Sequence, residues 1–162
     1  MDKRLKILVI EDGQENIDGA KEQLAEHEVT IMKSFTEFFN AYSCYTGRKS
    51  RDNQELLKKL AGFDCVLTDI NLPSPHDREG VVEGATGFAI VLRAIEAGVA
   101  YIGALTDANH HADVHSKALD MWSKQKAFVV GKSKVCLDND NYVECGYKNW
   151  GDMLRYELLD AK

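Results

Sequence analysis

Residues 5–10, with the sequence LKILVI, form a short and nearly continuous apolar run close to the start of the chain. Such a run is typical of a β-strand that is buried on both faces. Residues 14–27 follow with Ile17, Ala20 and Leu24 at three- and four-residue steps, which predicts an amphipathic helix. A buried strand followed directly by a helix is the repeating unit of parallel α/β sheets.

The same alternation continues along the chain. Further strands are predicted at residues 28–32, 63–69 and 99–105, and from 128–130 onward. Further helices are predicted from residue 34, broken or interrupted by a loop at 43–51, and at 88–97, 112–126 and 149–160. Two short β-like runs at 135–145 predict an extra hairpin after the fifth strand. We therefore expect one α/β domain over residues 1–162, with a doubly wound, five-stranded parallel sheet.

Composition narrows the class of protein. Of 162 residues, 44% are hydrophobic and 28% are charged, which favours a folded core over a disordered chain. Lys and Arg number 20 against 26 Asp and Glu, and because binding to phosphates needs a basic surface, nucleic acid is disfavoured as the main partner. No apolar run approaches the roughly 20 residues of a membrane span. Four cysteines without CxxC spacing indicate a reducing compartment, so we expect a soluble, cytoplasmic protein.

Polar residues follow the predicted strands at corresponding places. Glu11 and Asp12 follow the first strand, Asp69 ends the third, Thr106 follows the fourth, and Lys132 follows the fifth. The carboxyl ends of parallel strands meet at one edge of the sheet, where open α/β sheets bind their ligands. These residues, distant in sequence, are therefore expected to share one pocket.

The residue types in this pocket indicate a particular chemistry. Three converging carboxylates repel one another unless a cation offsets their charge, and oxygen ligands of this kind suit Mg²⁺. An Asp carboxylate beside the metal can attack a phosphoryl group and form an acyl phosphate. Lys132 would supply a positive charge to the transferred group, and the hydroxyl of Thr106 would supply a hydrogen bond. The pattern predicts a phosphoryl-acceptor site.

Four motifs, VIEDGQ, VLTDINLP, GALTD and VVGKS, resemble in this order the receiver domain of two-component response regulators. The resemblance spans roughly residues 5–159 and implies the flavodoxin-like strand order 2-1-3-4-5. The residues that it implies for Mg²⁺ are Glu11, Asp12, Asp69 and the backbone carbonyl of Asn71. The residues that it implies for phosphoryl transfer are Asp69 as acceptor, Thr106 as switch hydroxyl and Lys132 as salt-bridge partner.

The resemblance also implies a function. A stand-alone receiver accepts a phosphoryl group from a histidine kinase or a histidine phosphotransfer protein and commonly loses it by hydrolysis at the same site. It acts on no small molecule as an enzyme. Its output passes to a downstream protein target through protein–protein contacts, and formation of a homodimer is compatible with this role.

Three departures from the family pattern define an alternative. Asp107 follows the switch threonine where receivers usually have a small residue, and Ser133 follows Lys132 where they usually have a cis proline. A cis bond before Ser would cost about 2.5–4 kcal/mol. Val129 stands where an aromatic residue is usual, with Phe128 one position away. The alternative is a degenerate receiver that acts as a binding or scaffold module without phosphorylation.

Three other possibilities, a zinc site, a calcium loop and a small-molecule phosphatase, are less favoured by the sequence. His110, His111 and His115 could take zinc, but no further ligand completes the set, and a solvated helix start is favoured. Residues 138–140 resemble part of a calcium loop but lack its Gly and Glu, which favours a hairpin turn. A phosphatase of the haloacid-dehalogenase type would need D-x-D after the first strand, whereas the nucleophile-like Asp69 reads D-I-N and lies on the third strand.

Overall fold

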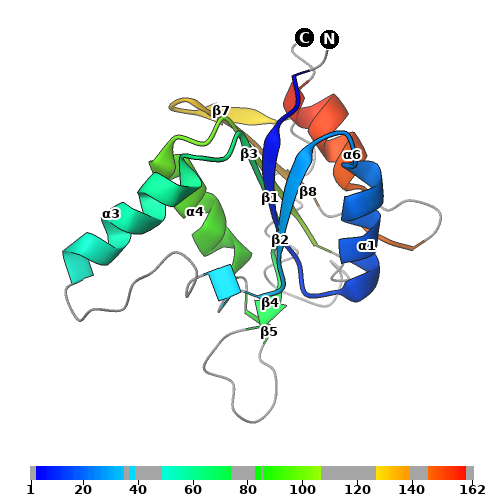
Figure 1. Cartoon of the computed structure of the whole chain (residues 1–162), viewed down its shortest axis with the longest axis horizontal. Coiled ribbons are helices and arrows are strands. Elements are labelled where there is room, and N and C mark those ends of the chain that lie inside the picture. Colours follow the sequence, from blue (N-terminus) through cyan, green and yellow to red (C-terminus); the bar gives the residue numbers. More distant parts are fainter. Residues whose placement is uncertain are drawn as a thin grey trace.

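A six-stranded β-sheet forms the centre of the protein, with the strand order β2-β1-β3-β6-β8-β7 (Figure 1). The structure is a computed structural model that describes residues 3–34, 37–38, 49–73, 83–84, 86–106, 127–138 and 146–159. The strands are β1 (Lys6–Ile10), β2 (Glu28–Met32), β3 (Cys65–Asp69), β6 (Tyr101–Leu105), β7 (Phe128–Val130) and β8 (Ser133–Asp138). Neighbouring strands from β2 to β8 are all parallel. The predicted fold class is confirmed, with β8 as the fifth parallel strand of the order 2-1-3-4-5.

The strand that begins at Phe128 is not the fifth parallel strand, as the sequence predicts, but an antiparallel edge strand. β7 pairs with β8 antiparallel, with Val130 opposite Ser133. Gly131 has φ 61°, and a glycine with positive φ at the start of a two-residue turn is typical of a tight hairpin. β7 and β8 form a hairpin that contains the fifth parallel strand, and it is not the hairpin predicted at 135–145 after that strand. Of the hairpin predicted at 135–145, residues 139–145 lie outside the described residues.

Helices cover both faces of the sheet (Figure 1). The helices on one side are α3 (Lys49–Leu60) and α4 (Gly87–Ala97). Those on the other are α1 (Gln14–Gln23), α6 (Trp150–Asp152) and the π-helical turn η1 (Met153–Leu159) that continues α6. The helix predicted at 112–126 and most of the 43–51 loop lie outside the described residues.

The core has two parts because successive residues of a buried strand point to opposite faces. Leu8 and Ile10 of β1 belong to the cluster that includes residues of α3 and α4. Ile7 and Val9 belong to the cluster that includes residues of α1 and α6. This explains why the strands read as continuous apolar runs instead of alternating ones.

The long segment after Asp69 contains a small ribbon, in which β4 (Leu72–Pro73) pairs antiparallel with β5 (Glu83–Gly84). The chain then enters α4, whose last residue, Ala97, is followed by the capping residue Gly98. Gly98 has φ 73°, a left-handed conformation that favours glycine at a helix C-terminus. Across the described part of the chain, no helix is long and apolar enough to cross a membrane.

Candidate functional site

Three carboxylates meet at the carboxyl edge of the sheet. Glu11 follows β1 and is buried, Asp12 comes next and is exposed, and Asp69 is the buried last residue of β3. Because β1 and β3 are adjacent and parallel, their ends bring these residues together. Each side chain offers an oxygen, and these oxygens all lie within 4.8 Å of one another. The structure thus brings together the three predicted carboxylates.

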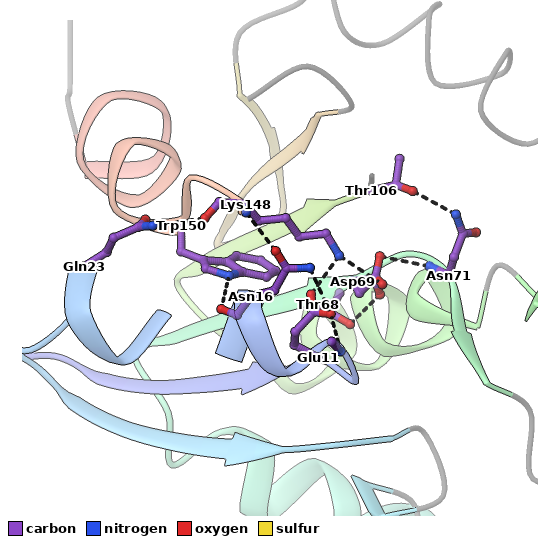
Figure 2. A network of polar contacts seen from close by, with 10 residues as sticks. Glu11, Asn16, Gln23, Thr68, Asp69, Asn71, Thr106, Lys148 and Trp150 are labelled. Atoms are coloured by element: carbon purple, nitrogen blue, oxygen red, sulfur yellow. Dashed lines mark hydrogen bonds and ion pairs between the residues drawn. The ribbon is translucent and has the colours of Figure 1, made fainter. Parts of the chain in front are cut away.

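The cation beside these carboxylates is Lys148 (Figure 2). Its Nζ lies 2.7 Å from Oε2 of Glu11 and 3.0 Å from Oδ2 of Asp69. The side chain of Lys148 is only 1% exposed. The Nζ also lies 5.8 Å from the centre of the Trp150 ring. The ammonium is therefore held in a buried position where it offsets part of the charge of two carboxylates.

Lys132, which the sequence predicts for this role, lies elsewhere. It is exposed in the turn between β7 and β8, immediately before the first residue of β8. Because β8 is parallel to β6, its first residue lies at the edge of the sheet opposite to the site. The prediction that placed Lys132 in the pocket is wrong because residues 128–130 form the antiparallel strand of the hairpin.

The periodic patterns of the sequence do not identify Lys148, and the local signal beside it is the helix cap that follows. Lys148 directly precedes Asn149, whose side chain accepts a hydrogen bond from the backbone N–H of Asp152 at 3.0 Å. An Asn that caps the last helix marks the point where the chain re-enters the helical layer at the carboxyl edge. A lysine at that point is a candidate for the site whatever the length of the preceding segment.

Asn71 and Thr106 lie on the other side of Asp69. The backbone N–H of Asn71 donates to Oδ1 of Asp69 at 3.1 Å, and its side-chain amide donates to Oγ1 of Thr106 at 2.8 Å (Figure 2). Thr106 is buried directly after β6. The structure therefore places Asn71 against the carboxylate of Asp69, and Asn71 bridges Asp69 and Thr106.

The backbone of Asp69 is held by the start of α4. An ideal Cβ on Gly87 would lie 2.0 Å from the carbonyl oxygen of Asp69 and 2.7 Å from Cα of Ile70. The N–H of Gly87 donates to the carbonyl of Ile70 at 3.0 Å. Only glycine allows the helix to approach this closely, so Gly87 sets the position of the backbone at the end of β3.

The charges of the site favour a further cation. Burial raises the pKa of Glu11; the nearby charge of Lys148 lowers it and the charge of Asp69 raises it. One ammonium offsets only one of the three carboxylates when all are ionised. Carboxylates with one exposed member, Asp12, form the kind of oxygen donor set that Mg²⁺ prefers. The residues present therefore fit a hard divalent cation.

Two of the three departures from the receiver pattern, at Ser133 and Val129, were counted from Lys132, and the structure places Lys148 in the site instead. Ser133 is the buried first residue of β8 and does not follow the lysine of the site. The residue that follows Lys148 is Asn149, and Val129 lies three residues before Lys132, which is not the lysine of the site. Asp107, the third departure, lies outside the described residues, as do His110, His111, His115 and residues 139–140.

The strand order and the helical layers on both faces give this chain a flavodoxin-like fold, as the sequence predicts. A comparison with solved structures finds a CheY-like response regulator receiver domain protein from Methanospirillum hungatei, with a TM-score of 0.45 and 15% identity over 87% of this chain and 85% of that chain. Another is the N-terminal domain of a response regulator/sensory box/GGDEF three-domain protein from Carboxydothermus hydrogenoformans, with a TM-score of 0.40 and 18% identity over 82% of this chain and 80% of that chain. No protein-family model matches the sequence. A comparison with curated proteins gives no match either.

Proposed function

We propose that this chain is a receiver that accepts a phosphoryl group on Asp69 in a Mg²⁺-dependent reaction. The observation that carries the proposal is the position of Lys148, whose ammonium lies between Glu11 and Asp69 in a cluster of three carboxylates. A nucleophilic carboxylate, a buried cation beside it and a hydroxyl within reach are the groups that acyl-phosphate formation requires. Thr106 supplies the hydroxyl, and Asn71 contacts both this hydroxyl and the carboxylate of Asp69.

The transfer step assigns a role to each of these side chains. An oxygen of Asp69 attacks the phosphorus of a phosphohistidine, a P–O bond forms, and the P–N bond breaks with its electron pair left on the imidazole, which takes up a proton. Lys148 gives a positive charge to the transferred group, and the hydroxyl of Thr106 donates a hydrogen bond to it. Hydrolysis of the acyl phosphate at the same site returns Asp69 to the carboxylate.

The carboxylates and one carbonyl would hold the metal. The proposed ligands are Asp12, Asp69 and the backbone carbonyl of Asn71, with Glu11 as the second acidic residue of the pair. When bound, Mg²⁺ supplies positive charge that offsets the phosphoryl oxygens and the acidic cluster. Asp12 is the exposed member of the cluster and therefore the one that an ion from solvent meets first.

The signal would leave the site as a change in charge and hydrogen bonding. Phosphorylation adds about −1.5 to −2 charges and strong acceptor oxygens. The oxygen of Thr106 accepts a hydrogen bond from Asn71, so a turn of this side chain toward a phosphoryl group would change the contact with Asn71. The proposed donors are a histidine kinase or a histidine phosphotransfer protein of the cytoplasm, and the proposed output is contact with a downstream protein or a second copy of the chain.

The test is a measurement of mass after incubation with acetyl phosphate and Mg²⁺. We expect the wild-type protein to gain the mass of one phosphoryl group and the Asp69→Asn variant to gain none. Chelation of Mg²⁺ should prevent the gain in the wild type. Absence of any gain at saturating Mg²⁺ would contradict the proposal.

The second candidate is a binding or scaffold module that uses this fold without phosphorylation. It is favoured by the ion pair itself, because the ammonium of Lys148 contacts both Glu11 and Asp69 without any ligand. For this candidate we expect no gain of mass and no binding of Mg²⁺ by calorimetry. Binding of Mg²⁺ together with phosphorylation would exclude it.

A further inference from the structure

The backbone on both sides of Lys148 is attached to α1 (Figure 2). The N–H of Lys148 donates to Oδ1 of Asn16 at 2.9 Å, and its carbonyl accepts from Nε2 of Gln23 at 3.1 Å. Oε1 of Gln23 also accepts from the N–H of Gly151 at 2.7 Å. Two amide side chains of α1, Asn16 and Gln23, therefore hold the backbone N–H and the backbone carbonyl of Lys148.

The attachment uses one face of α1. Gly19 and Ala20 lie three and four residues after Asn16, and Gln23 lies four and three residues after them, so all four share a helix face. An ideal Cβ on Gly19 would lie 2.5 Å from the ring of Tyr147, so the ring rests directly on this face. Ala20 belongs to the same core cluster as Trp150.

Asn16 joins this attachment to the site. Its Nδ2 donates to Oε1 of Glu11 at 3.4 Å, while Oε2 of Glu11 accepts from Nζ of Lys148. Nε1 of Trp150 donates to the backbone carbonyl of Asn16 at 3.2 Å. One buried amide thus contacts both the carboxylate that binds the ammonium and the backbone that carries it.

The strand alone does not place this lysine. The fifth parallel strand, β8, ends at Asp138, well before Lys148, and the chain between them includes residues 139–145. We propose that α1 positions Lys148 in the site through Asn16 and Gln23. This inference rests on the proposed function for its effect on phosphoryl transfer, but the positioning of the ammonium is testable without that function.

The first arm of the test measures the reactivity of lysines toward an amine-labelling reagent. In the native wild-type protein, Lys148 should label far more slowly than the exposed Lys132, because its side chain is buried. Gln23→Met removes both hydrogen bonds of Gln23 and keeps a side chain of similar length. We expect this variant to label at Lys148 roughly ten times faster or more, with Gln14→Met, on an exposed part of α1, as the matched control that does not change.

A second variant and an internal probe distinguish local exposure of Lys148 from unfolding of the whole protein. Asn16→Leu removes the other attachment point and should act in the same direction. Cys65 lies in the core, where burial raises the pKa of its thiol, so its alkylation reports loss of the whole fold. The inference requires faster labelling of Lys148 while alkylation of Cys65 stays slow.

The second arm measures the rate of phosphorylation by acetyl phosphate at saturating Mg²⁺. Misplacement of a catalytic group by about 1 Å can reduce a rate about 100-fold, so we expect a reduction of roughly 10- to 100-fold in Gln23→Met. If the wild type accepts no phosphoryl group, the proposed function fails and the labelling arm still decides the positioning. Labelling of Lys148 at the wild-type rate in both Gln23→Met and Asn16→Leu would overturn the inference.

Discussion

Lys148 is a buried cation whose two carboxylate partners are also buried. Its Nζ contacts Glu11 and Asp69 at 2.7 and 3.0 Å. Taking three charges out of water is costly, and removal of one partner leaves the others without compensation. Lys148 should therefore affect both the stability of the fold and the rate of phosphoryl transfer, and these two effects can be measured separately.

Replacement of Lys148 by Met should lower the stability of the protein. We expect the free energy of unfolding to fall by about 3 kcal/mol in the absence of Mg²⁺, because two buried carboxylates lose their cation. Urea denaturation at neutral pH measures the change. Lys132→Met is the matched control, since Lys132 is exposed in a turn, and its effect should stay within about 0.5 kcal/mol. Equal stability of the two variants would contradict this account of Lys148.

Glu11 gives the stability a dependence on pH. Burial raises its pKa above the ordinary value of 4.5, although Lys148 acts in the opposite direction. The folded protein therefore holds this proton more tightly than the unfolded chain does. The contribution of Glu11 to stability is complete below the unfolded pKa and is lost as the pH rises through the folded pKa.

The prediction for Glu11 concerns a difference between two proteins. Without Mg²⁺, the free energy of unfolding of the wild type relative to Glu11→Gln should decrease as the pH rises from about 4 to about 7. Urea titrations of both proteins across this range measure the difference. A difference that grows with pH would show that the pKa of Glu11 is lowered in the folded state.

At the scale of elements, α1 and α4 hold the two sides of the site. α1 carries the face that attaches residues 147–151, and α4 begins against the backbone of Asp69. Both contacts depend on residues without a large side chain, Gly19 and Gly87, because the opposing chain lies where a Cβ would be. The site is therefore sensitive to small changes at the two helices.

Gly87→Ala tests the contact of α4. The added methyl group would lie 2.0 Å from the carbonyl oxygen of Asp69, so the helix or the end of β3 must shift. We expect a loss of about 1–3 kcal/mol in the free energy of unfolding. Leu92→Ala, at a side chain of the same helix that is 66% exposed, should change it by less than about 0.5 kcal/mol. A Gly87→Ala protein as stable as the wild type would show that this close approach is absent.

At the scale of the whole molecule, the sequence predicts the sheet better than it predicts the site. Buried strands are recognisable in the sequence as apolar runs. The parallel sheet and the carboxylates at its edge could therefore be predicted from residues 5–12 and 63–69. The role of residues 128–130 could not, because a short apolar run reads the same in a parallel strand and in a hairpin. Gly131 with positive φ reverses the chain there, and this moves Lys132 to the opposite edge.

The position of Lys148 in the site could not be predicted from the sequence, for a physical reason. Its place depends on contacts with α1 that span more than a hundred residues of sequence, such as the hydrogen bond from its N–H to Asn16. Polar contacts between buried amides and a distant backbone leave no periodic pattern in the sequence. The fold class follows from local patterns, whereas the complete site follows only from the packing of the first helix against the start of the last.

The proposed function requires that Asp69 accepts a phosphoryl group in a site completed by Lys148. The most direct measurement is the mass gained from acetyl phosphate and Mg²⁺ by the wild type, Asp69→Asn, Lys148→Met and Lys132→Met in parallel. We predict that the wild type and Lys132→Met gain one phosphoryl group at similar rates, that Lys148→Met reacts at least about ten times more slowly, and that Asp69→Asn does not react. No gain in the wild type, or equal rates for the two lysine variants, would contradict it.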